Sequence, residues 1–324
     1  MNRGYLVRRA FYAFVTFIIV LVLNFFIPRL MPGSPVQYFA NPKILPSIEA
    51  HLLTQRFGLD KPIWDQFLLY ITGVFQWPPD LGVSYTFYPA PVWSVIMNYL
   101  PWTLLLVGTA TVVTAVIGIL VGIWIGSKQG TKTDTVVTSV SLFFWTMPFF
   151  WLGAILLWFF SIYLHVFPAG GAASTNLSGM PILNQVTNIA EHAFLPALTL
   201  TLAAFAGYSL IMRNTIVEEL GQDYVTVATA KGLSHRAVLF RHAARNALLP
   251  MITLIGLNLG YVVSGALLVE VVFSYPGVGW LTYQAVLSHD YPLLQGLFLV
   301  LSVAVIIANF LADVVYSLVD PRIK

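Results

Sequence analysis

Six long stretches of apolar residues, almost free of charge, constrain this chain more than any other feature of its sequence. They lie roughly at residues 10–30, 100–126, 136–165, 193–212, 251–273 and 294–319. The hydrocarbon core of a bilayer is about 30 Å thick, so a helix that crosses it needs about 20 apolar residues. Each stretch is apolar on all sides, which excludes helices that lie on a surface. We therefore predict an all-α membrane protein with six transmembrane helices.

The composition agrees with a bilayer protein and excludes several kinds of chemistry. Only 9% of the 324 residues are charged, whereas a soluble domain carries about 25%. The chain has no cysteine, so disulfides, thiolate metal sites and cysteine nucleophiles are excluded. Its net charge of +3 includes no run of basic residues, so we do not expect nucleic-acid binding.

The basic residues favour one orientation in the membrane. If the N-terminus is cytoplasmic, twelve of the 16 lysines and arginines lie on the cytoplasmic side and only Arg29, Lys43, Arg56 and Lys61 lie outside. The positive-inside rule then places both termini in the cytoplasm. The Arg8-Arg9 pair could alternatively belong to a twin-arginine export signal. The length of the apolar run and the lack of a small-residue cleavage site favour a retained first span.

Residues 31–99 form the one large loop predicted outside the membrane. Ser47 is placed to cap a short helix that ends at Gly58, and a second helix is expected from Asp60 to about Phe75. Tryptophans gather toward the second span, at positions 77, 93 and 102. This pattern is typical of a segment at the membrane interface, and anchoring there is preferred to ligand contact.

A charged segment over residues 213–249 separates the fourth and fifth apolar stretches. It predicts two short helices, with a break at Gly232 and a second helix that Ser234 caps and that runs toward Leu248 before Pro250. The second helix should pack through an apolar face that contains Ala237, Phe240, Ala244 and Leu248. Arg241 and Arg245 lie on another face. Such a hairpin either meets a partner protein or lies on anionic lipid headgroups.

Several motifs resemble one family of membrane proteins. The charged segment resembles the cytoplasmic loop of certain permeases, those in the dipeptide and oligopeptide branch of binding-protein-dependent ABC importers. The similar residues are Asp223-Tyr224-Val225, Ala228, Ala230-Lys231-Gly232-Leu233-Ser234 and the run over 241–250. Thr226 and Val227 replace the first two residues of the general permease motif Glu-Ala-Ala. Other similar motifs follow in order along nearly the whole chain, at residues 5–9, 29–36, 57–62, 66–67, 80–84, 272–279, 290–296 and 320–324.

Importers of this branch have two related permeases, and the resemblance is to the first of them. It implies a single permease domain over residues 1–324 with the type I ABC importer transmembrane fold. It implies that a coupling loop meets an ATPase through Asp223, Tyr224, Ala228, Ala230, Lys231, Gly232, Leu233, Ser234 and Arg241. The implied partners are a second related permease, two ATPases (identical or different) that bind ATP and Mg²⁺, an extracytoplasmic substrate-binding protein, and the lipid of a prokaryotic cytoplasmic membrane. The implied cargo is a di- or oligopeptide. Oligosaccharides, glutathione and nickel complexes are alternatives within the branch.

Polar residues within the apolar stretches are the candidates for contacts with a transported solute, because they are costly to bury in lipid. They are Asn24, Asn258, Glu270, Asn309 and Asp313. Asn258 and Asn309 lie deepest and are candidates for the translocation path, although hydrogen bonding between helices is the preferred alternative. Glu270 and Asp313 lie near the ends of their stretches, where a structural role is favoured.

The sequence offers no catalytic or metal-binding pattern. It lacks the phosphate-binding motif Gly-x-x-x-x-Gly-Lys-Ser/Thr, and its histidines are not spaced as metal ligands. We predict no catalytic residue, no metal and no cofactor in this chain. An ATP-independent secondary transporter or channel, and a membrane receptor or assembly protein, remain as rival functions. Co-purification of an ATPase would separate an importer from both rivals.

Overall fold

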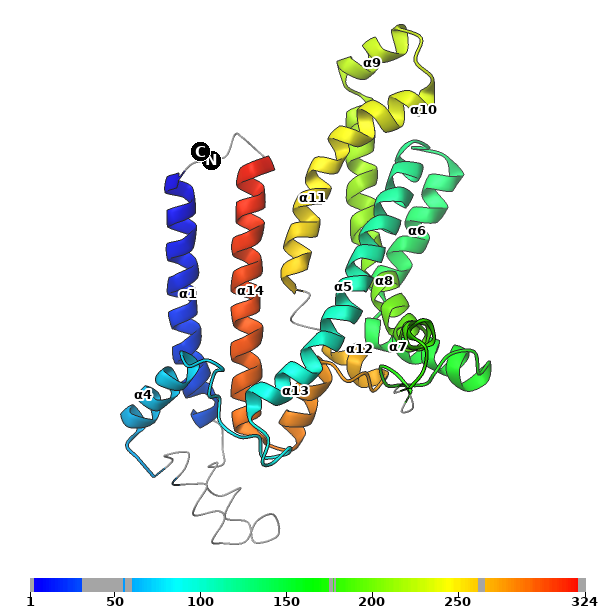
Figure 1. Cartoon of the computed structure of the whole chain (residues 1–324). Helices are drawn as coiled ribbons and strands as arrows, with labels where there is room; N and C mark the ends of the chain where they lie inside the picture. The colour runs from blue at the N-terminus through cyan, green and yellow to red at the C-terminus, as the bar shows by residue number, and fades with distance from the viewer. Residues whose placement is uncertain are drawn as a thin grey trace.

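The computed structural model describes residues 3–30, 55, 60–174, 177, 179–261 and 266–319, and these residues form an all-helical protein (Figure 1). Its principal helices are α1 (Arg3–Leu30), α4 (Ile63–Val74), α5 (Val92–Gly126), α6 (Lys132–Thr146), α7 (Phe149–Leu156), α8 (Ile182–Leu220), α9 (Asp223–Ala230), α10 (His235–Val238), α11 (Ala244–Tyr261), α12 (Leu267–Val272), α13 (Val278–Leu287) and α14 (Tyr291–Val319). Two π-helical segments extend α7 and α10: η1 (Leu157–Tyr163) and η2 (Leu239–Ala243).

Four of the described helices are each long and apolar enough to cross a membrane: α1, α5, α8 and α14. The third apolar stretch supplies a fifth span only if a bent pair of helices is counted as one. Its two halves, α6 and the segment Phe149–Tyr163, meet at an angle of 98°. The bend follows from Pro148, because a proline pushes the residue before it out of the helical region, and Met147 is extended.

The fifth apolar stretch contains parts of two helices. Helix α11 ends at Tyr261, α12 begins at Leu267, and residues 262–265 lie outside the described part of the chain. Helices α12 and α13 lie across the end of the bundle opposite α9 and α10 (Figure 1). The start of α1 and the end of α14 lie at the same end as α9 and α10.

The central packing contact joins α5 to α8 through glycines spaced four residues apart. Gly118, Gly122 and Gly126 let the two backbones approach closely. A Cβ atom at Gly122 would lie 2.6 Å from the carbonyl oxygen of Ser209, which is too close for any side chain. The contact therefore requires glycine.

Gly122→Ala should lower the thermal unfolding temperature, because overpacking a close contact costs about 1–3 kcal/mol. Gly207→Ala on α8 is the matched control, since a Cβ atom there meets nothing within 4 Å. Thermal unfolding of both variants in the same detergent measures the difference. Equal unfolding temperatures would show that the α5–α8 contact tolerates a methyl group.

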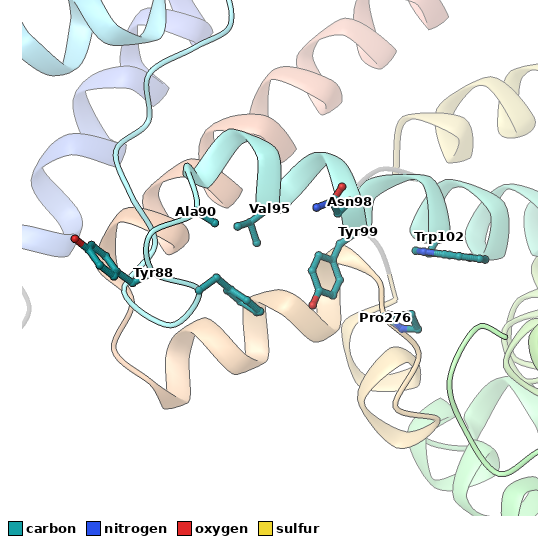
Figure 2. A pocket seen from close by; sticks show the side chains of 8 residues that line it. Tyr88, Ala90, Val95, Asn98, Tyr99, Trp102 and Pro276 are labelled. Atoms are coloured by element: carbon teal, nitrogen blue, oxygen red, sulfur yellow. The ribbon is translucent and has the colours of Figure 1, made fainter. Parts of the chain in front are cut away.

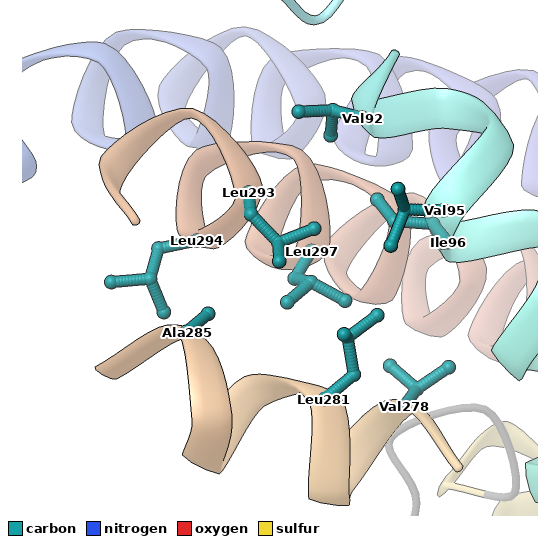
Figure 3. Packing of buried hydrophobic residues seen from close by; sticks show 9 residues of the cluster. All are labelled: Val92, Val95, Ile96, Val278, Leu281, Ala285, Leu293, Leu294 and Leu297. Atoms are coloured by element: carbon teal, nitrogen blue, oxygen red, sulfur yellow. The ribbon is translucent and has the colours of Figure 1, made fainter. Parts of the chain in front are cut away.

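A compact apolar cluster packs at the end of the bundle opposite α9 and α10 (Figure 3). It joins the first turns of α5, one face of α13 and the start of α14 through Val92, Val95, Ile96, Val278, Leu281, Ala285, Leu293, Leu294 and Leu297. Ser84 and the backbone N–H of Thr86 both donate to the buried carboxylate of Asp290, at 2.5 and 2.9 Å. The loop before α5 is thereby fixed against the segment that leads into α14.

Helix α4 occupies most of the second helix predicted in the outer loop, with Pro62 at its N-cap and Phe75 at its C-cap. The helix predicted between Ser47 and Gly58 lies outside the described residues, apart from residue 55. Asn24 on α1 is buried, and its amide donates to the carbonyl of Gln295 at 2.8 Å and to the hydroxyl of Tyr70 at 3.1 Å. Asn24 therefore bonds α1 to α14 and α4, which is a structural role.

Candidate functional site

The hairpin that α9 and α10 form has the break and the cap that the sequence predicts. Gly232 adopts φ +83°, a left-handed conformation that favours glycine. Ser234 then caps the second helix, and its hydroxyl accepts a hydrogen bond from the N–H of Ala237 at 3.3 Å. Asp223 lies in the first turn of α9, where a negative charge is favourable. The turn between α9 and α10 is therefore defined by its own sequence.

A glutamate that sequence reasoning missed connects the hairpin to the membrane helices. The Glu219 carboxylate, at the end of α8, accepts hydrogen bonds from the Tyr224 hydroxyl and, at 3.4 Å, from the Asn246 amide. Burial and the neighbouring Glu219 raise the pKa of Tyr224, so its hydroxyl keeps its proton near neutral pH. Glu219 therefore links α8, α9 and α11.

The predicted coupling residues fall into two groups in the structure. Ala228 is buried against Val225 and Val238, and Tyr224 is partly buried, so these two hold the hairpin together. The others are exposed to solvent: Asp223, Ala230, Lys231, Gly232, Leu233, Ser234 and Arg241. A partner can meet the second group directly, whereas Ala228 is out of its reach.

The predicted packing face of the second helix is wrong at Phe240. This side chain is 58% exposed, and the buried face contains Ala244, as predicted, together with Leu239, Ala243, Ala247 and Met251. The π-helical segment η2 is the reason, because it widens the turn and shifts the residues that face α5 and α8. Phe240 thus joins Val227 and Leu233 as exposed apolar side chains of the hairpin. We call these three side chains the apolar tip.

The second helix also extends much further than predicted. Helix α10, η2 and α11 follow one another without a break from His235 to Tyr261, with Pro250 inside α11. Similarly, α8 runs to Leu220, so the helix passes through Arg213, where the charged segment begins. The hairpin is therefore the continuation of two membrane helices, and a displacement of α10 passes directly into α11.

An ion pair whose carboxylate is buried joins α6 to α8 at the end of the bundle that carries the hairpin. Arg213 donates from Nε to Oδ1 of Asp134 and from Nη2 to Oδ2, each at 2.6 Å. The Gly130 N–H adds a third bond to this carboxylate at 3.0 Å, and Asp134 is only 3% exposed. A bidentate pair of this kind fixes the relative position of the two helices. The sequence gives no local signal for it.

Glu270 serves as a helix cap at the end of the bundle opposite the hairpin. It is fully buried, accepts a hydrogen bond from the Thr103 hydroxyl at 2.9 Å, and accepts another from the Trp280 N–H at 3.0 Å. The Thr103 oxygen in turn accepts the Val278 N–H at 2.7 Å. Two of the unpaired donors at the start of α13, the N–H groups of Val278 and Trp280, are thereby satisfied. A Cβ atom at Gly277 would overlap the Glu270 carboxylate, which explains that glycine.

The two candidates for the translocation path stay predictions. Asn258 lies on α11, and its side-chain surroundings are outside the described part of the structure. Asn309 on α14 is exposed and borders a groove of about 150 Å³ together with Arg9, Tyr12 and Thr16 of α1. The side chain of Asp313 is also outside the described residues.

A larger groove, of about 480 Å³, opens at the N-terminal end of α5 (Figure 2). It is lined by residues of the loop before α5, by residues of α5 and by Pro276. Its principal side chains are Phe87, Tyr88, Asn98, Tyr99 and Trp102. We call it the outer groove.

The all-helical fold and the apolar spans define a membrane protein, and comparison with known families gives its class. Residues 118–324 match the family of the binding-protein-dependent transport system inner membrane component, and residues 1–107 match the N-terminal part of the same kind of membrane component. The chain belongs to this family. It is therefore a multi-pass membrane permease.

The curated relatives align over nearly their full length. The chain is 33% identical over 321 residues to the oligopeptide transport system permease protein AppB of Bacillus subtilis (strain 168), covering 99% of each chain. It is 34% identical to the dipeptide transport system permease protein DppB of Escherichia coli (strain K12), covering 99% of this chain and 98% of the relative. It is 35% identical to the di/tripeptide transport system permease protein DppB of Pseudomonas aeruginosa (strain UCBPP-PA14), with the same coverage.

Proposed function

We propose that this chain is a pore-forming permease subunit of an ATP-driven ABC importer that carries di- or oligopeptides across a prokaryotic cytoplasmic membrane. The names of its relatives support peptides as the cargo. One structural observation carries the proposal: the apolar tip lies on a hairpin whose second helix runs without a break into α11. A partner that pushes on the hairpin thus moves a membrane helix.

The partners supply what this chain lacks in the proposal. A second related permease completes the pathway, and an extracytoplasmic substrate-binding protein delivers the peptide. Two ATPase subunits bind ATP and Mg²⁺ and carry out hydrolysis, to which this chain contributes no residue. Exposed residues of the hairpin meet one ATPase, with Lys231 and Arg241 beside the apolar tip.

Six spans with both termini in the cytoplasm complete the proposed topology. We assign them to α1, α5, the bent pair α6 with α7, α8, α11 and α14. The common location of the start of α1, the end of α14 and the hairpin supports this assignment (Figure 1). The excess of basic residues on that side supports a cytoplasmic orientation.

The contacts below the hairpin explain how one push would move several helices. Glu219 links α8 to the hairpin and to α11, and the Arg213–Asp134 pair links α8 to α6. Movement of the hairpin on ATP binding would therefore shift α6, α8 and α11 together as rigid elements. This is how the chain would open and close the path.

Phe240→Ala should reduce the amount of ATPase that purifies with the chain, because exposed aromatic residues dominate the energy of interfaces. We expect the affinity for the ATPase to fall about tenfold, which corresponds to about 1.4 kcal/mol of binding free energy. The neighbouring Leu239→Ala is the matched comparison, since Leu239 is buried and its loss should lower thermal stability. Unchanged ATPase recovery with Phe240→Ala would remove the apolar tip from the interface.

Uptake into liposomes tests the function itself. The importer assembled from this chain and its partners should accumulate a radiolabelled tetrapeptide only when ATP is present. Uptake without ATP would indicate a secondary transporter or channel, and binding without uptake would indicate a receptor. ATP-dependent uptake of an oligosaccharide, glutathione or a nickel complex in place of peptide would change the cargo within the same class.

A further inference from the structure

The outer groove combines aromatic rings with uncharged polar groups, which is the chemistry that binds peptide chains. Phe87, Tyr88, Tyr99 and Trp102 supply rings, while Asn98 supplies an amide. All the described residues that line it are uncharged. Aromatic faces cover apolar side chains, and amide or phenol groups pair with peptide N–H and C=O groups. An uncharged lining of this kind favours the middle of a peptide over its charged ends.

The groove faces water or solute rather than lipid tails. Asn98 is exposed on α5, and an amide turned toward hydrocarbon would be costly. Tyr88 is 52% exposed on the opposite rim. The groove also lies at the end of the bundle opposite the hairpin, which is the end a solute from outside reaches first (Figures 1 and 2). Its position suits an entry site.

The walls of the groove are held rigidly before any ligand arrives. Tyr99 stacks on Trp280 with 5.8 Å between ring centroids and 14° between the planes. Trp280 lies in the first turn of α13, which Glu270 and Thr103 cap. Trp102 packs edge-on against the buried Tyr275 at 6.4 Å. A site with fixed side chains loses little entropy when a ligand binds.

We propose that the outer groove binds the peptide on its way into the path, through its backbone and apolar side chains and without selecting for charge. This inference rests on the proposed peptide import. The peptide lies across α5, with Asn98 and Tyr99 hydrogen-bonded to its backbone and Trp102 and Phe87 against its side chains. Tolerance of many sequences follows, because backbone groups are common to all peptides.

The absence of cysteine from the sequence allows a direct test by thiol labelling. Asn98→Cys and, on the opposite rim, Tyr88→Cys each place the only thiol of this chain at the groove. Ser94→Cys is the matched control, because Ser94 is exposed on α5 but does not line the groove. The assembled importer in liposomes is labelled with a membrane-impermeant maleimide, with and without tetra-alanine, and uptake of tetra-alanine is measured in the same liposomes.

Tetra-alanine at about ten times the Kd measured for each variant should slow labelling of that variant's groove thiol about tenfold, because protection scales as one plus the ratio of ligand to Kd. The Ser94→Cys rate should not change. Tetrapeptides with one lysine or one glutamate in the middle should protect equally well. Protection that depends on the sign of this charge would overturn the uncharged recognition.

Four other results would overturn the proposal. If tetra-alanine is taken up but protects neither thiol, the groove is not its site and the importer function stands. If docking of the substrate-binding protein protects the thiols without peptide, that protein covers the groove. If the thiols react only in the isolated chain, another subunit of the importer covers it. If no tetrapeptide is taken up and an oligosaccharide protects the thiols, the peptide function fails together with the inference.

Discussion

Gly232→Val is expected to lower peptide uptake about tenfold while ATP hydrolysis by the partner ATPases continues. Gly232 has φ +83°, and a residue with a side chain pays about 1–2 kcal/mol or more to adopt a left-handed conformation. No atom lies within 4 Å of the position of a Cβ atom there, so the cost comes from the backbone and not from crowding. The turn would open, and α9 and α10 would no longer move as one hairpin.

Gly221→Val is the control for this substitution. Gly221 lies at the other end of α9, is exposed like Gly232, and has φ −83°, which any residue can adopt. Uptake and ATP hydrolysis are measured together in liposomes for both variants. Normal uptake by Gly232→Val would remove the turn from the coupling mechanism.

Arg213→Ala is expected to have the largest effect on stability, a loss of about 3–5 kcal/mol, because removing one partner leaves the buried Asp134 carboxylate unpaired. Thermal unfolding of the chain in detergent measures this loss. Arg213→Lys keeps the charge but cannot form both parallel bonds, so its unfolding temperature should lie between those of the wild type and Arg213→Ala.

The double variant Asp134→Asn with Arg213→Gln provides the control for lost charge. It leaves no buried carboxylate without a partner, so it should be more stable than Arg213→Ala alone. If Arg213→Ala unfolds at the wild-type temperature, the pair does not hold α6 against α8, and the proposed joint movement of α6, α8 and α11 loses one link.

The sequence predicts those features that depend on local physics. Apolar length identifies α1, α5, α8 and α14 because the thickness of a bilayer fixes the length of a span. Gly232 and Ser234 mark the turn of the hairpin because left-handed backbone and helix caps each have strong residue preferences.

Features that depend on long-range packing could not be predicted. Asp134 and Arg213 are 79 residues apart, and Ser84 and Asp290 are 206 apart, so only the folded bundle brings them together. Regular helix spacing predicts Phe240 on the buried face because such spacing does not anticipate a π-helical segment. Glu270 was recognised as costly to bury, but its role as the cap of α13 requires the turn at Gly277 to be known.

Purification of this chain from its native membrane in a mild detergent, with identification of every protein that accompanies it, tests the importer assignment most directly. We predict a second permease of the same family and two ATPase subunits with phosphate-binding loops, and a loosely attached substrate-binding protein. A chain that purifies without an ATPase, and that moves solute in liposomes without ATP, would contradict the assignment to an ATP-driven importer.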